Sequence, residues 1–196
     1  AARMAKLGFT GANTIFEGER GFLKSFTLEY DVSALTNKLG YDFPNEFEYK
    51  AYSCARPIHN AIDCALNIRQ QMNVATSKVI AITMRRHPKW AHYHQNSKPK
   101  TYHEAQVSLS YSVAVALTDG AALFPQYKNE RLNDPELLRL AGMVEFVPDS
   151  SLPRGVSCLM ELTIDDGRSY KSQVDYPKGS IQNPMSEDEI YICLDL

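Results

Sequence analysis

Apolar residues recur every three or four positions over residues 57–71, and this spacing predicts a helix with one buried face. The stripe consists of Ile58, Ala61, Ile62, Ala65, Ile68 and Met72. Pro57 suits the start of this helix because its ring fixes φ and it has no N–H to leave unpaired. Before it, aromatic residues alternate with short polar ones over 47–52, which predicts a strand leading into the helix.

Other segments extend the same alternation of strands and helices. The β-branched run at 78–84 predicts a buried strand, and further strands are predicted at 143–147, 156–164 and 169–175. Asp165-Asp-Gly-Arg168 is typical of a hairpin turn between the last two strands. Helices are predicted at 31–39, 103–118 and 135–141, of which 103–118 is apolar nearly all round and therefore buried. The pattern predicts an α+β fold, with a mostly antiparallel sheet and helices packed on one face.

Residues 85–103 interrupt this pattern with a long polar segment that contains two prolines and the only tryptophan. Such composition predicts a long mobile loop. A loop of this length often covers a functional site, but it is equally often a surface excursion, and the sequence leaves both interpretations open.

Composition narrows the classes of protein and of partner. The chain has 196 residues, 44% hydrophobic and 22% charged, which suits one main soluble domain. A formal net charge of −2 gives no reason to expect nucleic acid or an anionic membrane as partner, and no apolar run is long enough to span a bilayer. Four cysteines without CxxC spacing suit reduced thiols, and we expect a cytoplasmic protein.

Candidate chemistry gathers where the predicted strand meets the first helix. Lys50 and Arg56 bring two cations to a helix N-terminus, whose free N–H groups favour anions. His59 and Asp63 are four residues apart on one helical face, so the carboxylate is positioned to hold the imidazole toward a ligand. This arrangement predicts a site for a carboxylate or phosphate, although a solvated helix face commonly carries the same residues.

Other chemical interpretations have less support. Cys54 and His59 suggest a nucleophile with its base, but they flank a turn, and nothing in the sequence places them in contact. The histidines at 87, 92, 94 and 103 lack metal-ligand spacing, so no metal site is predicted. The cations and aromatic residues of 85–103 suggest single-stranded nucleic acid, which the acidic balance of the chain disfavours.

Four segments, in order, resemble those of the MmgE/PrpD family and together span nearly the whole chain. The first is Lys50-Ala-Tyr-Ser-Cys-Ala-Arg-Pro-Ile-His-Asn-Ala-Ile-Asp63, which resembles the signature that opens the family's smaller domain. The second, residues 104–120, reads EAQVSLSYSVAVALTDG and is similar to a helix of the family. The third combines Asp134-Pro-Glu-Leu with residues from Val144 onward, and the fourth is Pro177-Lys-Gly-Ser-Ile-Gln-Asn-Pro-Met-Ser186.

The resemblance implies both an activity and an architecture. The family comprises 2-methylcitrate dehydratases, cis-aconitate decarboxylases and iminodisuccinate epimerases, which perform proton chemistry beside a carboxylate of a di- or tricarboxylic acid. In these enzymes a helical domain supplies catalytic histidines and an aspartate, and the smaller α+β domain closes over the substrate. No cofactor is implied.

Mapped onto this chain, the resemblance predicts three parts. Residues 1–29 are expected to be the tail of a missing helical domain and its linker, 30–185 the α+β lid domain, and 186–196 the start of a truncated helix launched by a capping box. Because the helical domain would supply the principal base, we expect this polypeptide to be inactive alone. A stand-alone, non-catalytic domain for carboxylate binding or oligomerisation is the alternative, and a homo-oligomer is expected.

The resemblance also assigns roles to individual residues. Lys50 and Arg56 would neutralise carboxylates of a small polycarboxylate substrate, and His59 would orient or contact it. Tyr111 matches the position of an active-site tyrosine and would assist proton transfer, with Ser108 as a substrate contact. The residues alone leave another role open, because a buried tyrosine hydroxyl usually satisfies a nearby backbone group.

Overall fold

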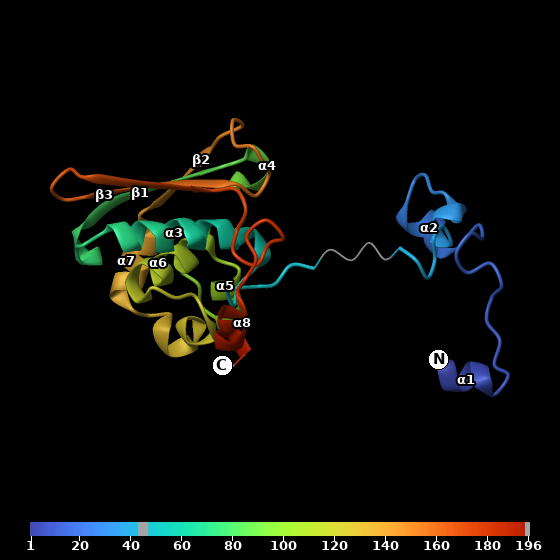
Figure 1. The fold of residues 1–196 in the computed structure, drawn as a ribbon. Coiled ribbons are helices and arrows are strands. Elements are labelled where there is room, and N and C mark those ends of the chain that lie inside the picture. Colours follow the sequence, from blue (N-terminus) through green and yellow to red (C-terminus); the bar gives the residue numbers. More distant parts are fainter. Residues whose placement is uncertain (43–46, 195–196) are drawn as a thin grey trace. The chain divides into compact units, whose positions relative to one another are not determined.

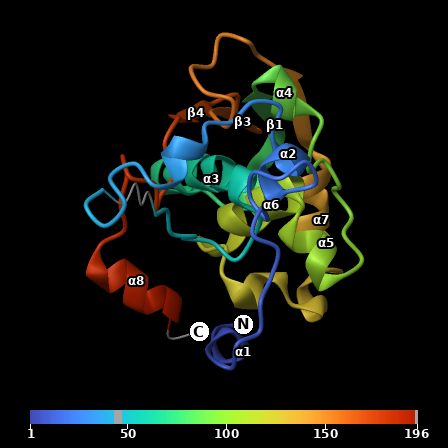
Figure 2. The same cartoon turned by 90° about the vertical axis from the view of Figure 1, so that its right-hand side faces the viewer.

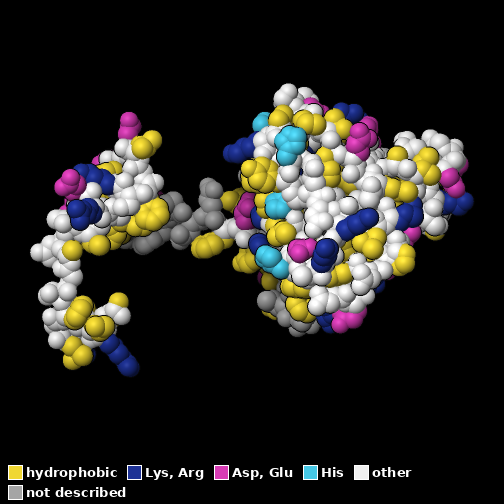
Figure 3. Space-filling model, turned by 180° about the vertical axis from the view of Figure 1, so that it is seen from behind, with side chains coloured by type: hydrophobic (Ala, Val, Ile, Leu, Met, Phe, Trp, Pro, Cys, Tyr) yellow, Lys and Arg dark blue, Asp and Glu magenta, His cyan; other side chains and the backbone are white. Residues whose placement is uncertain are grey.

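The computed structural model describes residues 1–42 and 47–194, in two compact units, Ala1–Asn45 and Glu46–Leu196. The first unit contains the helices α1 (Ala2–Lys6) and α2 (Phe22–Phe26) and the 3-10 helix η1 (Val32–Leu35), which is shorter than the predicted helix at 31–39. None of these three elements contains a buried residue. Figure 3 shows apolar side chains on the surface of this unit, so hydrophobic burial contributes little to its fold.

The second unit is built on a four-stranded sheet in the order β2-β1-β3-β4. The strands are β1 (Val79–Arg86), β2 (Val144–Pro148), β3 (Cys158–Ile164) and β4 (Ser169–Val174). β1 pairs with β3 and β3 with β4 in antiparallel fashion, whereas β1 and β2 are parallel. The prediction of a mostly antiparallel sheet in an α+β fold is therefore confirmed.

The predicted strand at 47–52 is wrong, because residues 47–52 do not join the sheet. The segment is held instead by isolated backbone hydrogen bonds, from Tyr49 N to the Gly179 carbonyl (2.9 Å) and from Ser53 N to the Ala122 carbonyl (3.0 Å). A Cβ on Gly179, whose φ is +85°, would lie 2.2 Å from the Tyr49 carbonyl oxygen. Only glycine fits this close approach of two backbones.

Helices cover one face of the sheet, as predicted (Figure 1). The short η2 (Arg56–Ile58) leads into α3 (His59–Gln71), which contacts β3 and β4 on one side and α6 (Leu109–Asp119) on the other; α6 in turn packs on α7 (Pro135–Gly142). The apolar stripe of α3 is buried almost completely. Its large apolar side chains join the core between the layers, together with Ile82, Met84, Leu117, Leu140, Met160 and Leu162.

Short elements connect these layers. They are η3 (Thr76–Lys78), α4 (Pro88–Ala91), α5 (Tyr102–Gln106), η4 (Phe124–Tyr127), η5 (Asn129–Arg131) and α8 (Glu187–Leu194). The predicted capping box before α8 is present, since Ser186 N donates to Glu189 Oε2 (2.8 Å) and Glu189 N donates to Ser186 Oγ (3.2 Å). Within the described ranges, no helix combines the length and apolar character that a bilayer crossing requires.

The last residue of β1, Arg86, is buried, although the sequence had placed it in the polar segment 85–103. Its guanidinium donates to the carbonyls of Trp90 (2.9 Å), Tyr93 (3.3 Å) and Pro57 (2.9 Å). Burial lowers the pKa of Arg86 from its ordinary value. This one side chain therefore ties the sheet to α4 and to the start of the α3 region.

The rest of the segment 85–103 contains α4 and a connection that leads from α4 to α5 (Figure 2). Leu109 N donates to the His94 carbonyl at 2.8 Å, and Ser108 Oγ donates to the Asn96 carbonyl. His94 has a φ of +67°, an uncommon conformation for a residue other than glycine. The connection thus supplies acceptors to the start of α6, and its predicted mobility stays a prediction.

Candidate functional site

His59 lies at the first position of α3 and is completely buried. Its ring packs against the Tyr52 ring in a T-shaped arrangement, with 5.1 Å between the ring centroids. Burial, with a further contribution from the Arg56 guanidinium, lowers the pKa of the imidazole to about 3. Neither ring nitrogen meets the full geometry of a hydrogen bond with a described residue, but a hydrogen-bond interaction with the Cys54 backbone opposes part of the pKa shift. His59 is therefore a neutral imidazole at physiological pH.

Asp63 does not orient His59, and this part of the prediction is wrong. One carboxylate oxygen accepts a short hydrogen bond from the Tyr52 hydroxyl, and the other accepts from Lys178 N at 2.7 Å. Burial raises the pKa of Asp63, while the Tyr52 and Lys178 hydrogen bonds oppose that shift. Asp63 thus fixes Tyr52 rather than the imidazole that it was expected to hold.

Arg56 is half-buried beside the start of α3, and its charge is already paired. Nη2 lies 3.0 Å from Glu48 Oε2, and Nε donates to the same oxygen at 3.2 Å. The guanidinium binds a carboxylate of the chain itself, which is the chemistry predicted for a substrate. A substrate carboxylate at this position would have to displace Glu48.

Lys50 is exposed and lines a pocket of about 460 Å³. No carboxylate among the described residues pairs with its ammonium group. The polar lining consists of Lys50, Ser53, His103 and Gln106. The remaining lining consists of Tyr52, Cys54, Ala55, Tyr102, Val107 and Phe124. Figure 3 shows histidine side chains gathered on one side of this unit.

Ser108 interrupts the helix that was predicted to be continuous over 103–118. It is the N-cap of α6, where its Oγ accepts from Tyr111 N at 3.0 Å and donates to the Asn96 carbonyl. Serine favours this role because its hydroxyl satisfies an N–H that has no partner within the helix. The side chain is fully buried, so its predicted contact with substrate stays a prediction.

Replacing Ser108 with alanine is expected to lower the free energy of unfolding by about 1–2 kcal/mol, because a buried N–H and the Asn96 carbonyl lose their partner. The measurement is urea unfolding followed by circular dichroism. Ser110→Ala is the control, since the buried Ser110 hydroxyl donates to the Gln95 carbonyl at a long 3.5 Å. Equal losses in both variants would contradict the capping role.

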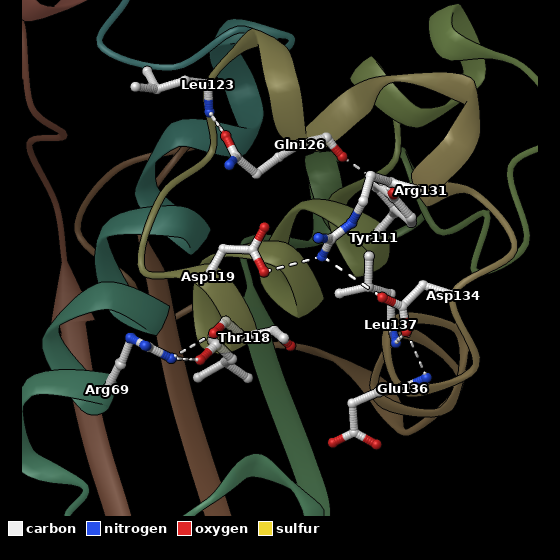
Figure 4. Close-up of polar contacts among 11 residues, drawn as sticks. Arg69, Tyr111, Thr118, Asp119, Leu123, Gln126, Arg131, Asp134, Glu136 and Leu137 are labelled. Carbon is white, nitrogen blue, oxygen red and sulfur yellow. Dashed lines mark hydrogen bonds and ion pairs between the residues drawn. The ribbon is translucent and has the colours of Figure 1, made fainter.

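Tyr111 lies in the core of the same helix. Figure 4 shows its hydroxyl directed at the Gln126 carbonyl, to which it donates at 3.1 Å. Burial raises the pKa of Tyr111 to about 12. Close by, Arg131 joins the end of α6 to the start of α7 by pairing with Asp119 (3.0 Å) and Asp134 (3.6 Å). The structure thus gives the hydroxyl the backbone partner that the residues alone left open.

The far end of α6 is fixed by α3. Gly120 adopts a left-handed conformation with φ +72°, and Arg69 of α3 donates to the carbonyls of Leu117 and Thr118 (Figure 4). A Cβ at Gly120 would lie 2.9 Å from Arg69 Nε. The helix that carries Ser108 and Tyr111 is therefore capped at both ends by side chains.

Residues 52–191 match the family model for the MmgE/PrpD C-terminal domain. The chain belongs to this family. The matched range includes Arg56, His59, Ser108 and Tyr111, and Lys50 lies two residues before it. No curated protein matches the chain.

In this MmgE/PrpD domain, the junction brings only part of the predicted site together. Lys50 lines the pocket, whereas Arg56, His59, Ser108 and Tyr111 are not among the residues that line it. The sequence reasoning missed His103 and Phe124, which reach the same pocket from α5 and η4. His103 had been grouped with loop histidines, and no sequence spacing indicated that these segments meet Lys50.

Three cysteines in the described part of the MmgE/PrpD domain are candidate nucleophiles by residue type. Cys54, Cys64 and Cys158 are buried and unbridged, and burial raises the pKa of the Cys54 thiol to about 12. Cys64 lies in the core. No group of three or more His, Cys, Asp or Glu side chains within the described ranges is arranged to hold a metal ion.

Proposed function

We propose that this domain binds a carboxylate of a small organic acid in the Lys50 pocket, as the lid of an MmgE/PrpD lyase or isomerase that acts on di- or tricarboxylic acids. The observation that carries the proposal is the exposed ammonium group of Lys50, which lines a pocket and has no carboxylate partner among the described residues. A cation beside a substrate carboxylate makes the neighbouring C–H more acidic and stabilises the enolate-like charge that develops.

Under this proposal, three of the other predicted site residues must first give up a contact within the protein before they can meet a substrate. His59 presents a neutral imidazole whose ring nitrogens have no side-chain partner among the described residues, which suits hydrogen bonding to a substrate or a partner group. Arg56 binds a second carboxylate after releasing Glu48. Tyr111 donates a proton only after its hydroxyl leaves the Gln126 carbonyl, and Ser108 contacts substrate only if the cap of α6 opens.

The test is the affinity of the chain for citrate, cis-aconitate and 2-methylcitrate, measured by isothermal titration calorimetry. Lys50→Ala is expected to weaken binding about tenfold, because a charge-assisted hydrogen bond is lost. Lys98→Ala is the matched control, since Lys98 is exposed and does not line the pocket. Binding that is equal in the three proteins would refute the proposal.

A second candidate is a stand-alone, non-catalytic domain that binds carboxylates or mediates oligomerisation. The observation that favours this candidate is the exposure of large apolar side chains in the first unit. Covering such side chains with another protein surface is energetically favourable. Turnover of any of these acids by the chain would exclude the non-catalytic candidate. Binding that depends on Lys50 without turnover favours the non-catalytic domain or a requirement for the helical domain, and turnover by the chain alone favours the enzyme.

A further inference from the structure

The Lys50 pocket has an aromatic wall that a purely carboxylic ligand would leave uncovered. Tyr102 of α5 and Phe124 of η4 form it, with ring centroids 5.4 Å apart and an angle of 54° between the ring planes. Phe124 remains 47% exposed even though it belongs to a pocket. The free energy gained by burying apolar surface is proportional to the area buried. A ligand with an apolar group against this wall therefore binds more tightly than one without it.

The wall is held in place before any ligand arrives. Tyr102 N donates to Asn129 Oδ1 at 3.2 Å, and Leu123 N, just before Phe124, donates to Gln126 Oε1 at 3.0 Å. The ammonium group of Lys128 lies 5.8 Å from the centroid of the Phe124 ring, within the range of a cation–π contact. A preformed surface gains affinity because little ordering accompanies binding.

The charged residues of the pocket lining determine which ligand charge the pocket favours. The lining contains one lysine and one histidine and, among the described residues, no aspartate or glutamate. Its volume of about 460 Å³ falls within the range of roughly 300–1,000 Å³ typical of small-molecule sites. The pocket thus combines a single permanent cation with a mainly apolar lining, which suits an amphipathic acid better than a uniformly polar one.

We infer that the pocket selects acids whose carbon skeleton carries an apolar substituent, branched alkyl or aryl, with a carboxylate at Lys50 and the substituent against Tyr102 and Phe124. This inference rests on the proposed function and names the substrate class of the same site. It makes Phe124 a specificity-determining residue, since its ring touches only the substituent and leaves the carboxylate contact to Lys50.

Succinate and benzylsuccinate test this inference, because they carry the same two carboxylates and differ in the aryl group. Titration calorimetry with the full chain is expected to show benzylsuccinate binding about tenfold more tightly than succinate. Phe124→Ala is expected to reduce this ratio to about threefold or less without changing succinate affinity, and Phe124→Leu to retain most of it. Tyr93→Ala, at an exposed aromatic residue outside the pocket lining, is expected to leave the ratio unchanged.

The outcomes separate this inference from the function beneath it. Lys50-dependent binding of both acids with equal affinity, or a ratio that Phe124→Ala does not alter, overturns the inference and leaves the proposed function standing. Failure of Lys50→Ala to weaken either acid, or no binding of either, overturns both. Circular dichroism of each variant verifies folding, and Phe124→Leu provides the comparison if Phe124→Ala is unfolded.

Discussion

Replacing Arg86 with methionine is expected to lower the free energy of unfolding by about 3–5 kcal/mol. The guanidinium serves three backbone carbonyls, those of Pro57, Trp90 and Tyr93, and each buried acceptor left without a donor costs about 1–3 kcal/mol. The expected loss is smaller than three times the upper value, because burying the Arg86 charge is itself costly and the variant removes that cost. Urea unfolding followed by circular dichroism measures it.

The neighbouring Arg85 provides a matched control on the same strand. Its side chain is 38% exposed, and its Nε lies 4.0 Å from Glu161 Oε2, which is the geometry of a weak surface ion pair. Arg85→Met is expected to change the free energy of unfolding by less than about 1 kcal/mol. If the two variants lost equal stability, Arg86 would not be the tie between β1, α4 and the start of the α3 region.

When the pH is lowered from 7.5 to 5, the free energy of unfolding is expected to fall by about 2 kcal/mol because of His59. Its pKa in the folded protein is lowered to about 3, against 6.5 ordinarily, so only the unfolded chain binds the proton in this range. Stability conferred by a neutral histidine is complete above about pH 6.5 and is lost as the pH falls toward 3. A pH of 5 lies about 1.5 units below the ordinary histidine pKa, and each unit lowers the free energy of unfolding by about 1.36 kcal/mol.

The measurement compares urea unfolding of the wild type and of His59→Gln at the two pH values. The variant cannot titrate at this position, so its loss on acidification is expected to be about 2 kcal/mol smaller. Asp63 acts in the opposite sense, because its raised pKa makes the fold favour the protonated carboxyl, and it contributes to both proteins alike. His92→Gln, at an exposed histidine, should keep the wild-type loss. Identical losses in His59→Gln and wild type would show that His59 accepts a proton in the folded state.

Local patterns predicted those parts of the fold in which neighbouring residues decide the structure. The apolar stripe of α3 and the capping box of α8 each depend on residues three or four positions apart. The aromatic residues before Pro57 gave the same signal as a strand, but sheet formation needs a partner strand, and residues 47–52 have only single bonds to distant loops. Arg86 was missed because charge in a sequence normally indicates solvent, whereas here three carbonyls replace it.

The candidate site shows the same division. Lys50, Arg56 and His59 lie within ten residues of each other, so their shared junction follows from the sequence, but of the three only Lys50 lines the pocket. Which group each one meets depends on residues far along the chain, as with Asp63, whose carboxylate accepts from the backbone of Lys178. The aromatic wall of the pocket likewise joins α5 and η4 to Lys50. Contacts between segments so far apart in the sequence leave no periodic pattern from which they could be predicted.

The order of the strands has a consequence for synthesis on the ribosome. Both neighbours of β1 come late in the chain, since β2 begins at Val144 and β3 at Cys158. At about 5–20 residues per second, translation takes roughly 3–12 seconds to pass from the end of β1 to the start of β2. During that interval the backbone groups at the edges of β1 have no strand to pair with, so the nascent chain is most prone to aggregation or chaperone capture before β2 and β3 emerge.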